Sequence, residues 1–122
     1  MWSSETTLVF EGGRELGSSF LTENNDTNKK VKVSVTTIDT LMKDVDVENK
    51  LFIKMNIEGS EIEALKGAVE TINRYRPSWV IRTNHIVNGK TTDKTIEKFL
   101  DQRNYKTSTK ELSELTTFGK PN

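Results

Sequence analysis

Residues 51–61 constrain the fold of this 122-residue chain more than any other segment. Residues 51–57 are almost continuously apolar, a pattern typical of a buried strand in a parallel sheet. The chain then turns polar, and apolar residues recur at helical spacing between Ile62 and Ile72. A strand that passes directly into a helix indicates an α/β fold. Ligands of such folds bind beyond the carboxyl ends of the strands, so we expect chemistry from the polar residues at this strand end.

A β-hairpin is expected before this segment. Residues 6–10 are β-branched and aromatic, and residues 31–38 alternate between apolar and polar, as strands with one wet face do. We expect the two strands to pair across a polar loop over residues 23–30, with further loops at 12–13 and 17–19. Asp39 then stands where it can cap a short helix or turn over residues 39–42.

The segment that follows residue 57 predicts a helix and a further strand. Ser60 and Glu63 have the spacing of a capping box, which would start the helix. Pro77 prevents the helix from continuing beyond residue 76, and residues 78–83 have the composition of a strand.

The last third of the chain predicts one more helix and two more strands. Thr92 or Asp93 caps the helix, and residues 105–109 and 115–118 are strand-like. From residue 51 onward the order is therefore strand, helix, strand, helix, strand, strand. This alternation predicts a parallel sheet with right-handed crossovers.

The composition argues against several functional classes. Eighteen basic side chains balance eighteen acidic ones without a long basic run, so no nucleic-acid partner is expected. The chain has no cysteine and a single histidine, so we expect no metal site. No apolar run approaches the ~18–20 residues that span a membrane, and the start lacks the pattern of a signal peptide. We therefore expect a cytoplasmic protein with no membrane partner.

The hydrophobic fraction indicates a thin core. It is 33%, and the seven glycines raise it only to roughly 39%, against a typical ~45–50%. A value this low fits a piece of a larger domain, or a domain that leans on a partner.

Residues 52–68, FIKMNIEGSEIEALKGA, resemble the K-[IM]-D-[VI]-E-G-[AS]-E signature of the FkbM-like, S-adenosylmethionine-dependent methyltransferases. Asn56 stands where the family has aspartate. Weaker similarities flank the signature in the family's order: residues 35–41 resemble its V-T-L-D-D-L-L lead-in, and Arg76-Pro77 precedes a strand that ends at His85. Residues 96–105 resemble its penultimate helix and the turn after it.

The resemblance implies an α/β fold that is a partial Rossmann-like class I methyltransferase sheet, preceded by a β-hairpin. Residues 51–57 would be its fourth strand, residues 78–84 its fifth, and the tail its last two, with crossover helices between strands 4 to 7. The glycine-rich first strand is absent, because no G-x-G-x-G pattern occurs in the chain. We expect 1–122 to be a single domain fragment, with a hairpin and lead-in over 1–38 and a βαβα-β-β back half over 51–122.

The resemblance also nominates site residues. Asn56, Glu58 and His85 are candidate catalytic residues, and Asn56 and Lys54 are candidate cofactor-binding residues. Asn56 can hydrogen-bond but cannot take up a proton, so it either serves an altered site or merely caps the following turn. Glu58 either contacts ligand or favours the positive end of the next helix. His85 either acts as the base in O-methylation or is a surface or packing residue.

Two further residues near the candidate site have expected roles. Lys54 lies in an apolar strand, so it must reach a carboxylate, touch ligand or extend outward to solvent. Gly59 is expected to make the tight strand-to-helix turn.

Two functions are compatible with the sequence. The first is S-adenosylmethionine-dependent O-methyl transfer to a small-molecule or glycan hydroxyl, by a truncated chain that is weak or inactive alone. The second is a non-catalytic remnant that acts as an interaction or scaffold domain. Without a first strand, residues 51–57 would form an exposed apolar sheet edge. The expected partner is therefore a separate N-terminal half or a second copy in a homo-oligomer.

Overall fold

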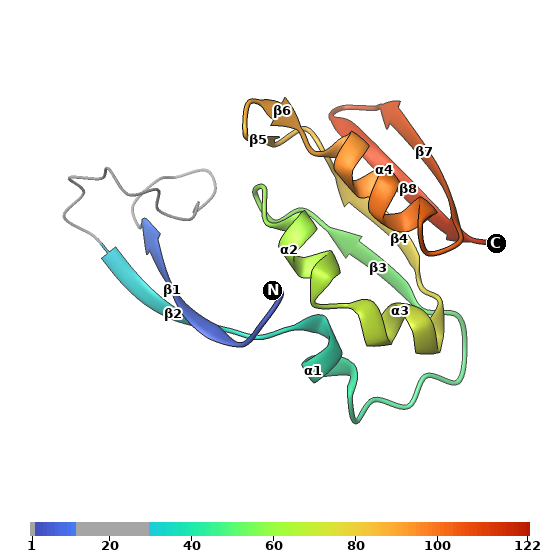
Figure 1. Cartoon of the computed structure of the whole chain (residues 1–122), viewed down its shortest axis with the longest axis horizontal. Helices are drawn as coiled ribbons and strands as arrows, with labels where there is room; N and C mark the ends of the chain where they lie inside the picture. Colours follow the sequence, from blue (N-terminus) through green and yellow to red (C-terminus); the bar gives the residue numbers. More distant parts are fainter. Residues whose placement is uncertain (1, 12–29) are drawn as a thin grey trace.

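The computed structural model describes residues 2–11 and 30–122. The loops predicted at 12–13 and 17–19 lie outside the described residues, as does the loop predicted at 23–30 except for its last residue, which begins a strand. Figure 1 shows the arrangement of the elements. In chain order they are β1 (Thr6–Glu11), β2 (Lys30–Val35), α1 (Ile38–Met42), β3 (Phe52–Met55), α2 (Glu61–Lys66), α3 (Val69–Tyr75), β4 (Ser78–Arg82), β5 (Ile86–Val87), β6 (Lys90–Thr91), α4 (Asp93–Asp101), β7 (Tyr105–Glu111) and β8 (Leu115–Pro121).

A four-stranded mixed sheet carries the core, in the order β3-β4-β8-β7. β3 and β4 are parallel, with Ile53 opposite Trp79, whereas β8 runs antiparallel to both of its neighbours. The prediction of an entirely parallel sheet was therefore wrong for the tail. Only residues 112–114 join β7 to β8, and a connection this short can only return the chain antiparallel.

The predicted N-terminal hairpin is confirmed. β1 pairs antiparallel with β2, with Leu8 opposite Val33, and the hairpin extends away from the four-stranded sheet (Figure 1). The backbone N–H of Trp2 donates to the carbonyl oxygen of Thr36 at 3.0 Å and so ties the start of the chain to the end of β2. No helix in the described part of the chain is long and apolar enough to cross a membrane.

The helix predicted after residue 60 is divided into α2 and α3 at Gly67 and Ala68. The carbonyl oxygen of Gly67 accepts a hydrogen bond from the backbone N–H of Asp39 at 2.9 Å, which draws the start of α1 against this junction. A side chain at position 67 would overlap the carbonyl oxygen of Trp2, so glycine permits the close approach. The predicted apolar stripe survives the break, because Leu65, Ala68 and Ile72 are all fully buried.

The expected cap of α1 was also wrong. Thr37 is the N-cap, and its hydroxyl oxygen accepts a hydrogen bond from the backbone N–H of Thr40 at 3.0 Å. Asp39 instead caps α3, since its carboxylate accepts the backbone N–H groups of Glu70 at 3.1 Å and Thr71 at 2.7 Å. Sequence spacing could not reveal this cap, because donor and acceptor lie more than thirty residues apart.

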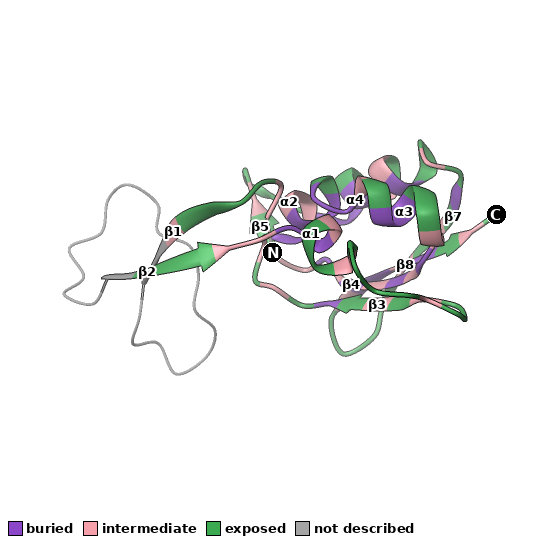
Figure 2. Ribbon diagram, turned by 90° about the horizontal axis from the view of Figure 1, so that it is seen from below, coloured by how far each residue is buried: buried purple, intermediate pink, exposed green. Residues whose placement is uncertain are grey.

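Helices cover one face of the four-stranded sheet, where β4 carries the centre of the core. Figure 2 shows α2, α3 and α4 on that face and no described helix on the other. The largest fully buried apolar side chains are Trp79, Leu65, Ile72, Ile81, Ile96 and Leu100. The strand over residues 51–57 was expected to be covered on both faces. In the structure it is shorter and lies at the sheet edge, and the Phe52 side chain is 61% exposed on the uncovered face.

The remaining strand predictions are confirmed with shifted ends. β4 ends at Arg82, so His85 follows the strand rather than ending it, while β7 continues two residues and β8 three residues further than predicted. The small β5–β6 hairpin was not predicted. Pro77 marks the end of α3 as expected, and Arg76 makes the turn with a left-handed backbone, φ 50°.

Candidate active site

The polar residues beyond β3 form a tight turn into α2. Glu58 and Gly59 have φ values of 56° and 95°, and the backbone N–H of Ser60 donates to the carbonyl oxygen of Ile57 at 3.2 Å. A φ of 95° suits glycine, which confirms Gly59 as the turn residue. The turn directs Glu58 toward the segment after β4 and leaves Asn56 exposed at the strand end.

Glu61, the first residue of α2, is fully buried beneath this turn. One of its carboxylate oxygens, Oε1, accepts the backbone N–H of Ile57 at 3.0 Å. The predicted capping box does not form, because the Ser60 side chain makes no capping bond. The Glu63 carboxylate instead accepts a hydrogen bond from Lys66 at 2.8 Å. That bond, with another from Ser3, lowers the pKa of Glu63. Glu61 therefore stabilises the turn that leads into α2, whereas the capping box expected at the start of this helix is absent.

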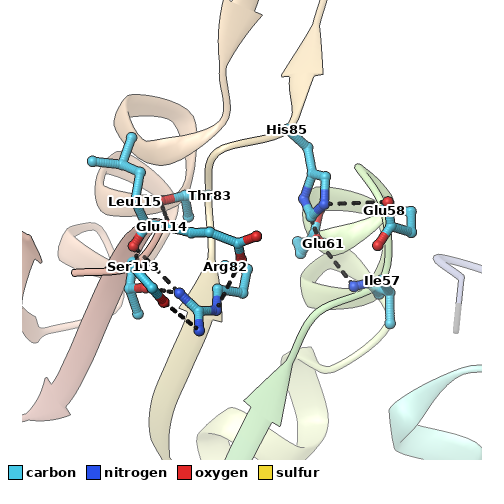
Figure 3. A network of polar contacts seen from close by, with 10 residues as sticks. Ile57, Glu58, Glu61, Arg82, Thr83, His85, Ser113, Glu114 and Leu115 are labelled. Carbon is cyan, nitrogen blue, oxygen red and sulfur yellow. Dashed lines mark hydrogen bonds and ion pairs between the residues drawn. The ribbon is translucent and has the colours of Figure 1, made fainter. Parts of the chain in front are cut away.

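His85 lies between the two glutamates (Figure 3). Its Nδ1 is 3.1 Å from Oε1 of Glu61 and its Nε2 is 3.5 Å from Oε2 of Glu58. The imidazole side chain is 15% exposed, Glu61 is fully buried and Glu58 is 47% exposed. The Nδ1 contact is within hydrogen-bonding distance, but Nδ1 forms no aligned hydrogen bond. The three side chains form a row from the interior to the surface.

Buried polar atoms without hydrogen-bond partners gather on the two segments that carry this row. Oγ of Ser60, Oε2 of Glu61, Oδ1 of Asn84 and Nδ1 of His85 are four of the seven such atoms among the described residues. Buried polar groups are normally paired, and unpaired ones are tolerated mainly where function requires them. The ends of β3 and β4 are therefore the strongest candidate for an active site.

A second network fixes the end of β4 on its other side. The guanidinium of Arg82 lies 3.4 Å from the carboxylate of Glu114 and donates to the hydroxyl of Thr116 at 3.1 Å (Figure 3). The backbone N–H of Thr83 donates to the carbonyl oxygen of Leu115 at 2.9 Å. These contacts tie the segment before His85 to the β7–β8 turn and so restrict where the imidazole can lie.

The structure brings together some of the predicted site residues and not others. Glu58 and His85 are within contact distance, as their positions after adjacent strands predicted. Asn56 lies at the same sheet edge, and among the described residues its side chain forms no hydrogen bond, so Glu61 rather than Asn56 satisfies the turn. Lys54 is exposed and has no ion pair within the described chain, which fits the alternative in which it extends to solvent.

Glu61 is the site residue that the sequence analysis missed. It was quoted only as part of the signature, because a glutamate in the first turn of a helix is normally an exposed group that favours the helix dipole. One feature of the sequence could have indicated the role of Glu61. It lies four residues after Ile57, across a turn in which a backbone N–H needs a hydrogen-bond acceptor. No group of three or more His, Cys, Asp or Glu side chains within residues 2–11 and 30–122 is arranged to hold a metal ion.

A hollow of about 1080 Å³ begins beside the row, since Gly59 and Val87 line it. Its walls come from α2, the β5–β6 hairpin and the start of α4, and they are rich in polar side chains such as Asn88, Lys90 and Thr91.

Comparison with known proteins identifies the family. The model of the methyltransferase FkbM domain matches residues 2–107. The chain belongs to the FkbM methyltransferase family. This match begins well before residue 35, where the recognisable motifs begin, so the N-terminal hairpin is included in the family domain.

A solved structure supports the assignment. The methyltransferase FkbM from Methylobacillus flagellatus KT is 27% identical in sequence to this FkbM-family chain, with a TM-score of 0.54. The alignment covers 72% of this chain and 23% of that protein. The chain thus spans about a quarter of the relative it matches. Curated protein sequences give no significant match.

Proposed function

We propose that this chain forms the acceptor-side half of an S-adenosylmethionine-dependent O-methyltransferase. The observation that carries the proposal is the row of Glu58, His85 and Glu61 beyond two adjacent parallel strands. Ligand sites of open α/β sheets lie at this place, and family membership supports methyl transfer as the chemistry.

The residues at the strand ends fit one side of the cofactor. The exposed amide of Asn56 offers both a donor and an acceptor, and the unpaired Oδ1 of Asn84 lies on the neighbouring segment. Asn56 would hold a polar group of S-adenosylmethionine, with Lys54 nearby on the same strand. When bound, the cofactor supplies a methyl group activated by its sulfonium.

His85 is proposed as the base for the acceptor hydroxyl. Glu61 holds the proton on Nδ1, which leaves the lone pair of Nε2 to take the hydroxyl proton as the oxygen gains the methyl group. The imidazolium that results lies between two carboxylates, so Glu58 and Glu61 stabilise its charge. Asn56 cannot accept this proton and acts only by hydrogen bonding.

The acceptor is proposed to be a small molecule or glycan that carries a hydroxyl group. The hollow beside Gly59 and Val87 supports this, because its hydroxyl, amide and ammonium groups suit a ligand with many hydroxyls. A cytoplasmic location remains a prediction.

The cofactor's glycine-rich loop is proposed to come from polypeptide outside these 122 residues. The chain contains no G-x-G-x-G pattern, and the free edge of β3 lies where a further strand can pair. A separate N-terminal half or a second copy of the chain are both candidates. We therefore expect the chain alone to bind the cofactor weakly and to transfer methyl groups slowly.

A non-catalytic interaction domain is the alternative. Asn56 in place of an acidic residue favours it, since the site loses a charge without an evident replacement. Under this alternative the sheet edge is used for binding and the strand ends bind no cofactor.

Calorimetric titration with S-adenosylhomocysteine distinguishes the two. We expect weak binding by the chain, and a dissociation constant raised about tenfold by Asn56→Ala through loss of a hydrogen bond to the ligand. Asn73→Ala, an exposed change on α3, is the matched control and should leave binding unchanged. Absence of binding by the natural chain, with none restored by Asn56→Asp, would favour the non-catalytic alternative.

A further inference from the structure

The face of the four-stranded sheet opposite the helices, called here the open face, has a distinct chemistry. Strand register places one set of side chains on it: Phe52, Lys54, Ser78, Val80, Arg82, Lys106, Ser108, Lys110, Thr116, Phe118 and Lys120. Five of these are basic and none is acidic, in a chain whose formal net charge is zero. The chain thus concentrates positive charge on the one sheet face that its helices leave uncovered (Figure 2).

An apolar hollow runs across the open face. Its volume is about 480 Å³, and Phe52, Val80 and Phe118 provide its apolar lining, with Lys106 and Lys120 beside them. The Phe52 ring is 61% exposed, whereas the equivalent positions on the helix-covered face are filled by buried side chains. An apolar floor between charged flanks is typical of a surface that binds another protein element.

The lysines of the open face have no internal partners. Within the described chain, no carboxylate lies within 4.0 Å of the ammonium groups of Lys106, Lys110 or Lys120, and all three are exposed. Arg82 differs, because Glu114 pairs with it. Lys106 and Lys120 line the apolar hollow, and Lys110 lies further along β7 on the same face, so all three charges are available to carboxylates from outside the chain.

We propose that the open face binds an amphipathic α-helix whose apolar stripe is flanked by acidic residues. A helix is the favoured element because an amphipathic helix presents a continuous apolar stripe with polar flanks, which matches an apolar hollow beside exposed lysines. Acidic flanks are favoured because they would meet Lys106, Lys110 and Lys120 while the stripe covers Phe52 and Phe118. A second copy of the chain does not fit, because two open faces would bring like charges together.

The open face has the positive charge of a nucleic-acid-binding surface, but the register of its strands argues against nucleic-acid binding. Stacking platforms present adjacent aromatic rings, whereas Phe52 and Phe118 lie on strands separated by β4 and at different levels of the register, Phe52 opposite Ser78 and Phe118 opposite Val80. An aliphatic centre suits leucine or isoleucine side chains better than bases.

Titration of the ¹⁵N-labelled chain with designed peptides tests the proposal. The probe is an 18-residue helix with leucine at i, i+3, i+4 and i+7 and glutamate elsewhere, and the comparison peptide has lysine in place of glutamate. We expect the acidic peptide to bind at least tenfold more tightly and to shift the amide signals of β7, β8 and residue 52. Higher salt should weaken the interaction, because the flanking charges are exposed.

Variants localise the effect. Lys106→Glu with Lys120→Glu should weaken binding of the acidic peptide at least tenfold, and Phe52→Ser should weaken it without unfolding the chain, since this side chain is mostly exposed. Lys32→Glu with Lys43→Glu makes the same charge change at exposed sites outside the four-stranded sheet and outside the polar hollow, and should have little effect. Equal binding of the two peptides, no binding of either, or insensitivity to the Lys106 and Lys120 changes overturns the proposal. Tighter binding of a single-stranded oligonucleotide or of phosphatidylglycerol vesicles would also overturn it.

Discussion

At the residue scale, Glu61 has the largest structural consequence in the candidate site. It is a fully buried carboxylate with two neighbours, the backbone N–H of Ile57 and Nδ1 of His85. A group in this position sets which imidazole nitrogen carries the proton. The proposed base therefore depends on a residue that would not itself touch the acceptor.

Nuclear magnetic resonance can test this dependence without any activity, because His85 is the single histidine of the chain. We expect the neutral ring to carry its proton on Nδ1, as ¹⁵N chemical shifts would show. Glu61→Ala should shift the ring toward the tautomer mixture of a free imidazole, and Glu61→Gln should retain part of the effect through its carbonyl oxygen. Asp44→Ala, an exposed change outside the site, is the control and should leave the tautomer unchanged. The same tautomer in the natural chain and in Glu61→Ala would refute the positioning role.

Asp39 offers a second prediction at this scale, for stability rather than chemistry. Its carboxylate accepts two backbone N–H groups at the start of α3 and the hydroxyl of Thr71. Replacing it by alanine should lower the free energy of unfolding by about 1–2 kcal/mol, the usual cost of a lost helix cap. Urea unfolding measures this. Asp44→Ala, at an exposed position, should change it by less than about 0.5 kcal/mol.

The sequence predicted the site residues only in part. Glu58 and His85 were placed correctly because residues that follow adjacent parallel strands must meet at one sheet edge. The burial of Glu61 depends on how the turn at Gly59 folds back over α2, and the cap from Asp39 depends on the packing of α1 against α3. Neither can be read from local spacing.

At the element scale, the junction of α2 and α3 joins the N-terminal segment to the rest of the fold. Gly67 accepts a hydrogen bond from Asp39 and lies against the backbone of Trp2. The sequence predicted one helix here because the apolar stripe is continuous. Tertiary contacts divide it, since the approach of Trp2 and Asp39 leaves no room for a regular turn with a side chain at this position.

Gly67→Ala tests this account of the junction. The new methyl group would overlap the Trp2 carbonyl oxygen, so we expect a loss of about 1–3 kcal/mol in the free energy of unfolding, the range for overpacking. Amide exchange should rise around residues 2 and 36–39, where the backbone must move. Asn73→Ala serves as the control on the exposed side of α3. An equally stable variant with unchanged exchange would mean that the contact with Trp2 is unimportant.

The remaining elements show why the positions of strands were predicted more accurately than the directions in which the strands pair. The apolar or alternating patterns of β3, β4, β7 and β8 are local, whereas strand direction depends on connections. The short β7–β8 turn made the tail antiparallel, although the order of elements favoured a parallel sheet. The β5–β6 hairpin contains only two residues in each strand, too few for any pattern.

At the scale of the whole molecule, β3 is both the edge of the sheet and the strand that leads into the candidate site. Among the described residues no strand pairs with its outer side, and an unpaired strand edge favours association with another chain. We therefore expect the isolated chain to self-associate or to be marginally stable. Size-exclusion chromatography with light scattering measures this. A cooperative, stable monomer at high concentration would contradict it.

The central claim is that the ends of β3 and β4 form one wall of a cofactor site. Titration of S-adenosylhomocysteine into the ¹⁵N-labelled chain, followed by amide chemical shifts, tests it most directly. The account predicts that the shifts concentrate on residues 56–61 and 83–85. Shifts confined to the open face or the N-terminal hairpin, or none at millimolar ligand, would contradict it.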